Sequence, residues 1–121
     1  MFRKSMKHAV DGLIFTIKSE RNFRIHLVIL FLTVIIGLLF GITNIEWLFI
    51  TVISSVVLFA ELINTAIEKF LDWLEPNHHD IVKIVKDVCA GAVLVSSMGA
   101  VIVGLIIFIP YGIDLALIFL E

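Results

Sequence analysis

Long apolar runs alternate with short polar stretches along this chain, and three of the runs are long enough to cross a membrane. They cover about residues 26–43, 47–74 and 86–109, the second of them becoming charged in its later part. A helix needs about 20 mostly apolar residues to cross a hydrocarbon core of roughly 30 Å. We therefore expect an all-α membrane protein with three transmembrane helices.

The N-terminal segment, about residues 2–20, has a different pattern. Apolar side chains recur at helical spacing on one face, and most of the charged side chains on the opposite face are basic. A helix of this kind is typical of the headgroup region of a bilayer. We predict an amphipathic surface helix that precedes the first span.

Polar residues, Pro and Gly mark the predicted boundaries. A polar hinge is expected at 19–24, a tight turn at 44–46 and a helix break at 76–80. Pro110 and Gly112 are expected to end the third helix and to leave a short apolar tail, because Pro removes a helical hydrogen bond.

The composition agrees with this reading, since 60% of the 121 residues are hydrophobic and 17% are charged. Soluble domains average about 45–50% apolar and about 25% charged residues. Three spans leave little chain for a separate soluble unit, so residues 1–121 are expected to form a single membrane domain. The lipid bilayer is its expected surrounding, and no nucleic-acid partner is expected.

The basic residues predict the orientation. Six of the nine precede the first span, and the other three, Lys69, Lys83 and Lys86, lie between the second and third spans. Basic residues concentrate on the cytoplasmic side of membrane proteins. In a plasma membrane, the N-terminus and the 69–87 region would be cytoplasmic and the C-terminus outside.

The second span carries four polar side chains on one face. At about 100° per residue, Glu61, Asn64, Glu68 and Asp72 fall within roughly 80° of one another. We call these four residues the acidic stripe. At about 1.5 Å per residue, Glu61 lies about 21 Å and Glu68 about 31 Å along the helix from Trp47. Glu61 would thus remain within the hydrocarbon, where an ionisable residue usually marks a functional site.

Other polar groups are expected at the level of Glu68. Glu20 ends the surface helix, and Lys86 and Asp87 open the third span. Carboxylates from two segments, together with a lysine, suit Mg²⁺ and a triphosphate, because Mg²⁺ is commonly held by one or two carboxylates plus phosphate oxygens. Taken alone, Asn64 equally fits a bond to a neighbouring helix, and Lys86 and Asp87 equally fit an ordinary helix start.

One long motif resembles a known family. The sequence ELINTAIEKFLD at 61–72 is similar to the signature of the small bacterial diacylglycerol kinases and undecaprenol kinases. ERNFR at 20–24 and KDVCAGAV at 86–93 support the resemblance, which extends from residue 4 to about residue 109.

The resemblance implies a homotrimer with active sites shared between subunits, and transfer of the γ-phosphate of Mg-ATP to a membrane lipid alcohol. It implies that Glu61 is the general base, supported by Asn64, and that Glu61 and Ala90 contact the lipid. Glu20 and Glu68 would hold the metal. The implied ATP contacts are His8, Glu20, Glu68, Asp72, Asn77, His78, His79, Lys86 and Asp87.

Two positions depart from the family pattern. An arginine often found ahead of the surface helix has no clear counterpart, with Arg3 as a substitute, and His26 stands where the enterobacterial diacylglycerol kinases carry a carboxylate. The second departure favours the Gram-positive branch and undecaprenol as the acceptor, with diacylglycerol as the alternative. A pore-forming or structural oligomer is the distant alternative, and a pore is disfavoured because residues 47–60 offer only three hydroxyl side chains.

Overall fold

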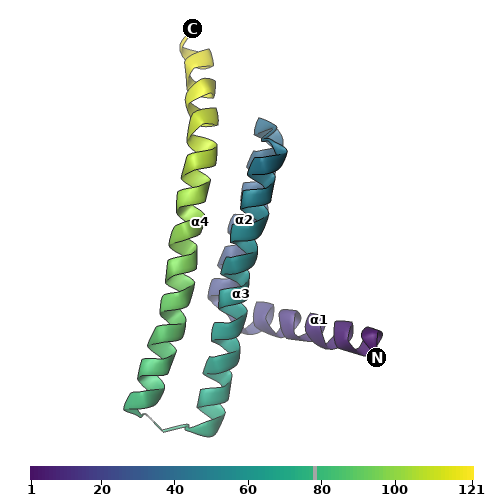
Figure 1. Ribbon diagram of the computed structural model, residues 1–121, viewed down its shortest axis with the longest axis vertical. Coiled ribbons are helices and arrows are strands. Elements are labelled where there is room, and N and C mark those ends of the chain that lie inside the picture. Colours follow the sequence, from purple (N-terminus) through teal and green to yellow (C-terminus); the bar gives the residue numbers. More distant parts are fainter. Residues whose placement is uncertain (78) are drawn as a thin grey trace.

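Four helices make up the protein in the computed structural model, which describes residues 1–77 and 79–121. The helix α1 spans Phe2–Ser19, α2 spans Arg21–Phe40, α3 spans Asn44–Leu74 and α4 spans Asp80–Leu120. In Figure 1, α2, α3 and α4 run alongside one another, and α1 projects sideways from them like an arm. The last three helices are each long and apolar enough to cross a membrane. This arrangement confirms the predicted fold class.

The described part of the chain has no extended soluble core. Its buried apolar residues are few, and most large apolar side chains on α2, α3 and α4 are exposed. Backbone polar groups are satisfied within the helices, so these apolar surfaces suit lipid or neighbouring membrane helices. The small hydrophobic cluster that does form contains Ile42, Ile50 and Ile107, with Trp47 and Phe108 packed against it.

The predicted hinge at 19–24 was too long. Glu20 alone separates α1 from α2, with an extended backbone. The guanidinium of Arg24 donates hydrogen bonds of 2.7 Å and 3.0 Å to the carbonyl oxygens of Ile17 and Lys18. These carbonyls lie in the last turn of α1, where helical partners are missing. Arg24 therefore closes α1 while already being part of α2.

The predicted turn at 44–46 lies slightly earlier, at residues 41–43. Gly41 ends α2 in the left-handed conformation, with φ of 63°, which glycine adopts without steric cost. Thr43 and Glu46 then form a capping box, in which the Thr43 amide donates to Glu46 Oε1 at 2.9 Å and the Glu46 amide donates to Thr43 Oγ1 at 3.2 Å. Asn44 and Glu46 are thus helical residues rather than turn residues.

The expected end of the third helix at Pro110 and Gly112 was wrong. The helix α4 continues through both residues to Leu120. Membrane helices tolerate Pro because neighbouring groups compensate for the lost hydrogen bond. Here Tyr111 contacts residues of other helices. Its ring stacks on the Phe40 ring, with 5.5 Å between the ring centres, and its hydroxyl donates a hydrogen bond to Glu46 Oε1 at 2.5 Å.

The break between α3 and α4 was predicted at 76–80, and α4 begins at the last of those residues. Asp80 is already helical, and His79 caps the helix by accepting a hydrogen bond from the Ile81 amide at Nδ1, 3.1 Å away. Lys83, Lys86 and Asp87 therefore stand on the first turns of α4. We call this end of the bundle the connection end, and the end at residues 41–43 the turn end.

Candidate active site

The acidic stripe begins in the interior of the bundle. Glu61 is 3% exposed, and one turn later Thr65 is 4% exposed and donates its hydroxyl hydrogen to the Glu61 carbonyl at 2.9 Å. A buried carboxylate loses the stabilisation that water would provide, so it requires a compensating partner. The cost of burying this carboxylate therefore favours a functional role for Glu61.

An ionisable side chain from α2 contacts Glu61. Nε2 of His26 lies 3.2 Å from Oε1 of Glu61, which is an ion-pair distance. The ring nitrogen is not aligned to donate a hydrogen bond, so Oε1 has no hydrogen-bond partner within the described part of the chain. At this distance a small rotation of the imidazole is enough to align Nε2–H with Oε1.

One turn further along α3, Asn64 and Glu68 form a pair. The Asn64 amide donates to Glu68 Oε1 at 3.5 Å. Its carbonyl oxygen is buried and accepts no hydrogen bond from the residues that the structure describes. A buried carboxamide oxygen without a donor suits a cation or an incoming donor group, since buried polar atoms are normally satisfied.

Glu20 reaches the stripe from the junction between α1 and α2. Its Oε1 lies 3.7 Å from Nζ of Lys69, which in turn lies 5.9 Å from the centre of the Phe15 ring. Because Lys69 directly follows Glu68 in α3, this contact places Glu20 at the level of Glu68. The two carboxylates that the family resemblance assigns to the metal therefore lie in the same region of the bundle.

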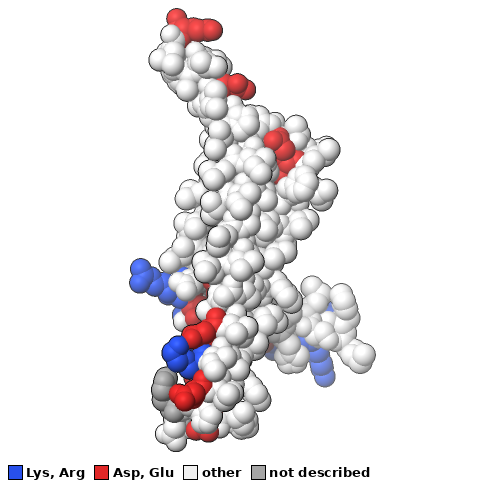
Figure 2. Space-filling view, turned by 60° about the vertical axis from the view of Figure 1, so that its left-hand side comes forward, with Lys and Arg blue, Asp and Glu red and all other residues white. Residues whose placement is uncertain are grey.

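The outer part of the stripe contacts α4. Nζ of Lys86 lies 2.5 Å from Oδ1 of Asp72, so these two predicted site residues meet across the helix pair. Asp87 is bound instead to Lys83, one turn away on its own helix, at 2.6 Å. Figure 2 shows acidic and basic side chains gathered at the connection end of the bundle.

The remaining predicted residues lie around this cluster. His8 lines a cavity between α1 and α3 together with Thr65 and Lys69, which places it beside the stripe. Ala90 is exposed on α4. Asn77 is exposed in the connection between α3 and α4, and His79 uses one ring nitrogen as the α4 cap. The predicted contact at His78 lies outside the described residues.

The predicted Mg²⁺ site stays a prediction. Across residues 1–77 and 79–121, no three His, Cys, Asp or Glu side chains gather closely enough to hold a metal by themselves. Two carboxylates and phosphate oxygens are nevertheless a sufficient set for Mg²⁺. The donors Glu20 and Glu68, with the unpartnered oxygen of Asn64, fit such a shared site because all three are hard oxygen ligands.

His26 is the side chain whose importance at the site the sequence analysis missed. It was noted only as a departure from the enterobacterial pattern. The signal that would have found it is its position, an ionisable residue at the start of an apolar span. Such residues generally face the interior of a membrane bundle and pair with one another.

Comparison with known proteins identifies the family of this chain. The family model for prokaryotic diacylglycerol kinase matches residues 7–108. The chain is 39% identical over 109 residues to an undecaprenol kinase of Bacillus subtilis (strain 168), covering 90% of this chain and 89% of that protein. It is 34% identical over 107 residues to a diacylglycerol kinase of Synechocystis, covering 88% of this chain and 61% of that protein. The chain therefore belongs to the prokaryotic diacylglycerol kinase family and is a multi-pass membrane lipid kinase that uses ATP.

Proposed function

We propose that this kinase transfers the γ-phosphate of Mg-ATP to the hydroxyl of undecaprenol. The acceptor is inferred from the similarity to the Bacillus subtilis undecaprenol kinase, which extends over 90% of the chain. The observation that carries the chemistry is the burial of Glu61 within a membrane helix, with Nε2 of His26 lying 3.2 Å from its carboxylate. A lipid hydroxyl is confined to the membrane boundary, and a base that serves it must be at the same depth.

In this proposal Glu61 is the general base. It takes the proton of the lipid hydroxyl as the hydroxyl oxygen attacks the γ-phosphorus, and the bond between that phosphorus and the bridging oxygen of ADP breaks. The products are the lipid phosphate and ADP, with the proton on Glu61. Glu61 is suited to this role because it is shielded from water but faces a second helix through His26.

Glu20 and Glu68 would hold Mg²⁺, with Asn64 supporting the site. When bound, Mg²⁺ neutralises charge on the phosphates, which is the main requirement of phosphoryl transfer. Two helical turns, about 10.5 Å along the axis, separate Glu61 from Glu68. This spacing leaves room for the γ-phosphate between the lipid hydroxyl and the nucleotide.

The nucleotide would bind at the connection end. Lys86 supplies a cation for the phosphates, and its contact with Asp72 holds the ammonium at the outer end of the stripe. The proposed ATP-contacting residues are His8, Glu20, Glu68, Asp72, Asn77, His78, His79, Lys86 and Asp87. Ala90 is proposed to contact the lipid, together with Glu61.

The assembly and the orientation are proposals of the same kind. The exposed apolar faces of α2, α3 and α4 support a homotrimer of single-domain subunits, residues 1–121, with sites shared between neighbours. Lys and Arg are confined to α1, the start of α2 and the connection end of α3 and α4. This distribution supports a cytoplasmic connection end and an external C-terminus.

Diacylglycerol is the second candidate acceptor, and the similarity to the Synechocystis diacylglycerol kinase favours it. Both lipids present a hydroxyl on an apolar body. The deciding experiment measures transfer of radiolabel from γ-labelled ATP to each lipid, added separately to the purified protein in matched detergent micelles. Undecaprenol should give the higher kcat/KM. A preference for diacylglycerol would overturn the proposed acceptor but not the kinase activity.

A further inference from the structure

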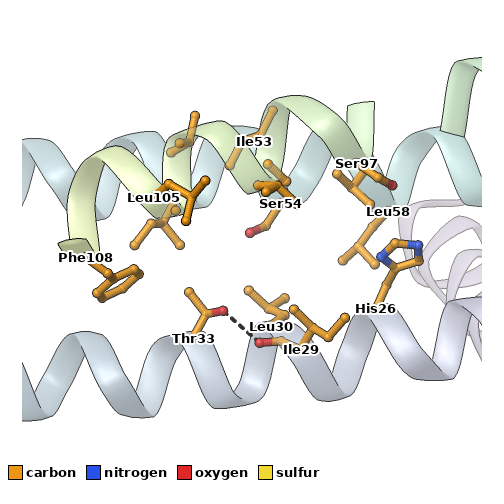
Figure 3. A pocket seen from close by; sticks show the side chains of 16 residues that line it. His26, Ile29, Leu30, Thr33, Ile53, Ser54, Leu58, Ser97, Leu105 and Phe108 are labelled. Carbon is orange, nitrogen blue, oxygen red and sulfur yellow. Dashed lines mark hydrogen bonds between the residues drawn. The ribbon is translucent and has the colours of Figure 1, made fainter. Parts of the chain in front are cut away.

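His26 occupies the boundary between two environments. On one side its Nε2 lies 3.2 Å from the buried Glu61 carboxylate. On the other side it lines a cavity of about 480 Å³ between α2, α3 and α4. In Figure 3 the imidazole lies at one end of this cavity, near Leu58 and Ser97. A single side chain thus touches both the candidate base and the apolar interior.

His26 also has a distinct chemical character in that cavity. The walls are built from aliphatic residues, Phe108, Gly104 and the hydroxyl side chains Thr33, Ser54 and Ser97. Of the described residues that line it, His26 is the only ionisable one. Ionisable groups are costly in such surroundings and are retained mainly where they serve a function. The proximity of Glu61 identifies that function.

The second observation concerns the Glu61 oxygen itself. Oε1 is buried without a hydrogen-bond partner among residues 1–77 and 79–121, although a ring nitrogen lies 3.2 Å away. An unsatisfied buried oxygen is unfavourable, and a hydrogen bond from His26 to this oxygen removes the deficit. The same bond would restrict rotation of the carboxylate.

We propose that His26 is a positioning residue for Glu61. Its Nε2–H donates to Oε1 and holds the carboxylate so that the other oxygen, Oε2, faces the lipid hydroxyl. During the reaction the hydroxyl proton passes to Oε2, the hydroxyl oxygen bonds to the γ-phosphorus, and the bond from that phosphorus to the ADP oxygen breaks. His26 keeps its own proton throughout. This inference rests on the proposed function, in which Glu61 is the base.

Three substitutions at one position test this role. His26→Gln retains an N–H donor near the Nε2 position, His26→Asn places its donor nearer the Nδ1 position, and His26→Leu removes the donor. Misplacing a catalytic group by about 1 Å can reduce the rate by about 100-fold. We expect kcat for lipid phosphorylation to fall by about 100-fold in the Leu and Asn variants and by less than about 10-fold in the Gln variant. KM for Mg-ATP should stay unchanged in all three.

The comparison of Gln with Asn remains informative if the Leu variant does not fold, because both side chains are polar amides. Equal activities of the Gln and Asn variants would overturn the proposal, as would wild-type kcat in the Leu variant. The control is Thr51→Val. Thr51 is exposed on α3, and its hydroxyl donates to the Trp47 carbonyl within the same helix, at 2.8 Å.

A double substitution tests whether His26 acts through Glu61 or independently of it. Glu61→Asp shortens the side chain by one methylene and withdraws the carboxylate from His26. If His26 acts through Glu61, adding His26→Leu to Glu61→Asp should reduce kcat by less than about 3-fold further, because residues that act as a unit are not additive. An equal loss in both backgrounds would show that His26 acts separately.

The failure of this inference is distinguishable from failure of the proposed function. Wild-type turnover in the Glu61→Gln variant would show that Glu61 is not the base, and the proposed mechanism would be wrong. An inactive Glu61→Gln protein combined with a fully active His26→Leu protein would leave the mechanism in place and overturn only the positioning role.

Discussion

The hydroxyl of Tyr111 donates a hydrogen bond of 2.5 Å to Glu46, joining the far part of α4 to the first turn of α3. The two residues are 65 positions apart in the chain. Glu46 simultaneously accepts hydrogen bonds from the amide and the hydroxyl of Thr43, at 2.9 Å and 3.0 Å. One carboxylate therefore fixes the turn between α2 and α3 and anchors α4 beyond Pro110.

Replacing Tyr111 with Phe should weaken the turn end. The ring would still stack on Phe40, but the bond between α4 and Glu46 would be lost. We expect a lower midpoint of thermal unfolding in detergent and little change in kcat, because the site is at the other end of the bundle. Glu46→Gln, which retains an acceptor oxygen, should be affected less. An unchanged midpoint in Tyr111→Phe would contradict the anchoring role.

Gly37 is expected to be sensitive to any added side chain. A Cβ at this position would lie 2.6 Å from Cη2 of Trp47 and 3.2 Å from Cδ1 of Ile42. Overpacking of this kind typically costs about 1–3 kcal/mol, and Ala is favoured over Gly in a helix by about 1 kcal/mol, so Gly37→Ala should lower the stability of the folded protein by up to about 2 kcal/mol.

Gly112→Ala is the matched control for Gly37→Ala. Gly112 is also helical, but a Cβ there would have no neighbour within 4 Å. Ala is favoured over Gly in a helix by about 1 kcal/mol, so Gly112→Ala should leave stability unchanged or raise it slightly. Both proteins can be compared by thermal unfolding in the same detergent. Equal stability of the two variants would show that Trp47 moves aside at little cost.

The sequence was sufficient to predict the spans and the stripe because both depend on local patterns. Apolar run length predicts membrane helices directly, and the 61–72 motif places four polar groups on one helical face. Lys86, which was expected at the level of Glu68, contacts Asp72 one turn further along α3.

The errors arose where a distant partner overrides a local preference. Pro110 predicts a helix end when considered alone, but Tyr111 is held by Phe40 and Glu46 from other helices. The hinge at 19–24 was predicted from polarity, whereas Arg24 satisfies the end of α1 from within α2. The His26–Glu61 contact joins residues 35 positions apart on different helices, so the position of His26 at the start of a span marks it as a candidate but does not identify its partner.

Lys86→Met is expected to weaken nucleotide binding. It removes the cation that contacts Asp72 and leaves the acidic stripe without that neutralising charge. We expect KM for Mg-ATP to rise by about 10-fold or more, since hydrogen bonds to charged groups are worth about 1.5–3 kcal/mol. KM for the lipid should change little. Lys18→Met removes an exposed lysine at the end of α1 and is the control. If both substitutions raised KM for Mg-ATP equally, Lys86 would contribute only as one of several surface charges.

Glu68→Gln should uncouple ATP binding from Mg²⁺. The amide keeps the size of the side chain, but it cannot supply the anionic oxygen that Mg²⁺ prefers. Titration of ATP into the wild-type protein, with and without Mg²⁺, should show Mg²⁺-dependent tightening that is absent in the variant. Glu75→Gln, at the end of α3, should retain the tightening. A Mg²⁺ dependence that persists in Glu68→Gln would exclude Glu68 as a metal ligand.

Glu61→Gln should abolish lipid phosphorylation without unfolding the protein. The carboxamide has the same shape and is easier to bury than a carboxylate, so the variant should be at least as stable as the wild type. It cannot take the hydroxyl proton, however, and general-base catalysis typically contributes about 10²–10⁴-fold to the rate. Turnover should therefore fall by about 100-fold or more. Mg-ATP binding should be retained, because the proposed nucleotide site lies at the connection end. Loss of Mg-ATP binding together with turnover would place Glu61 at the nucleotide rather than at the lipid hydroxyl.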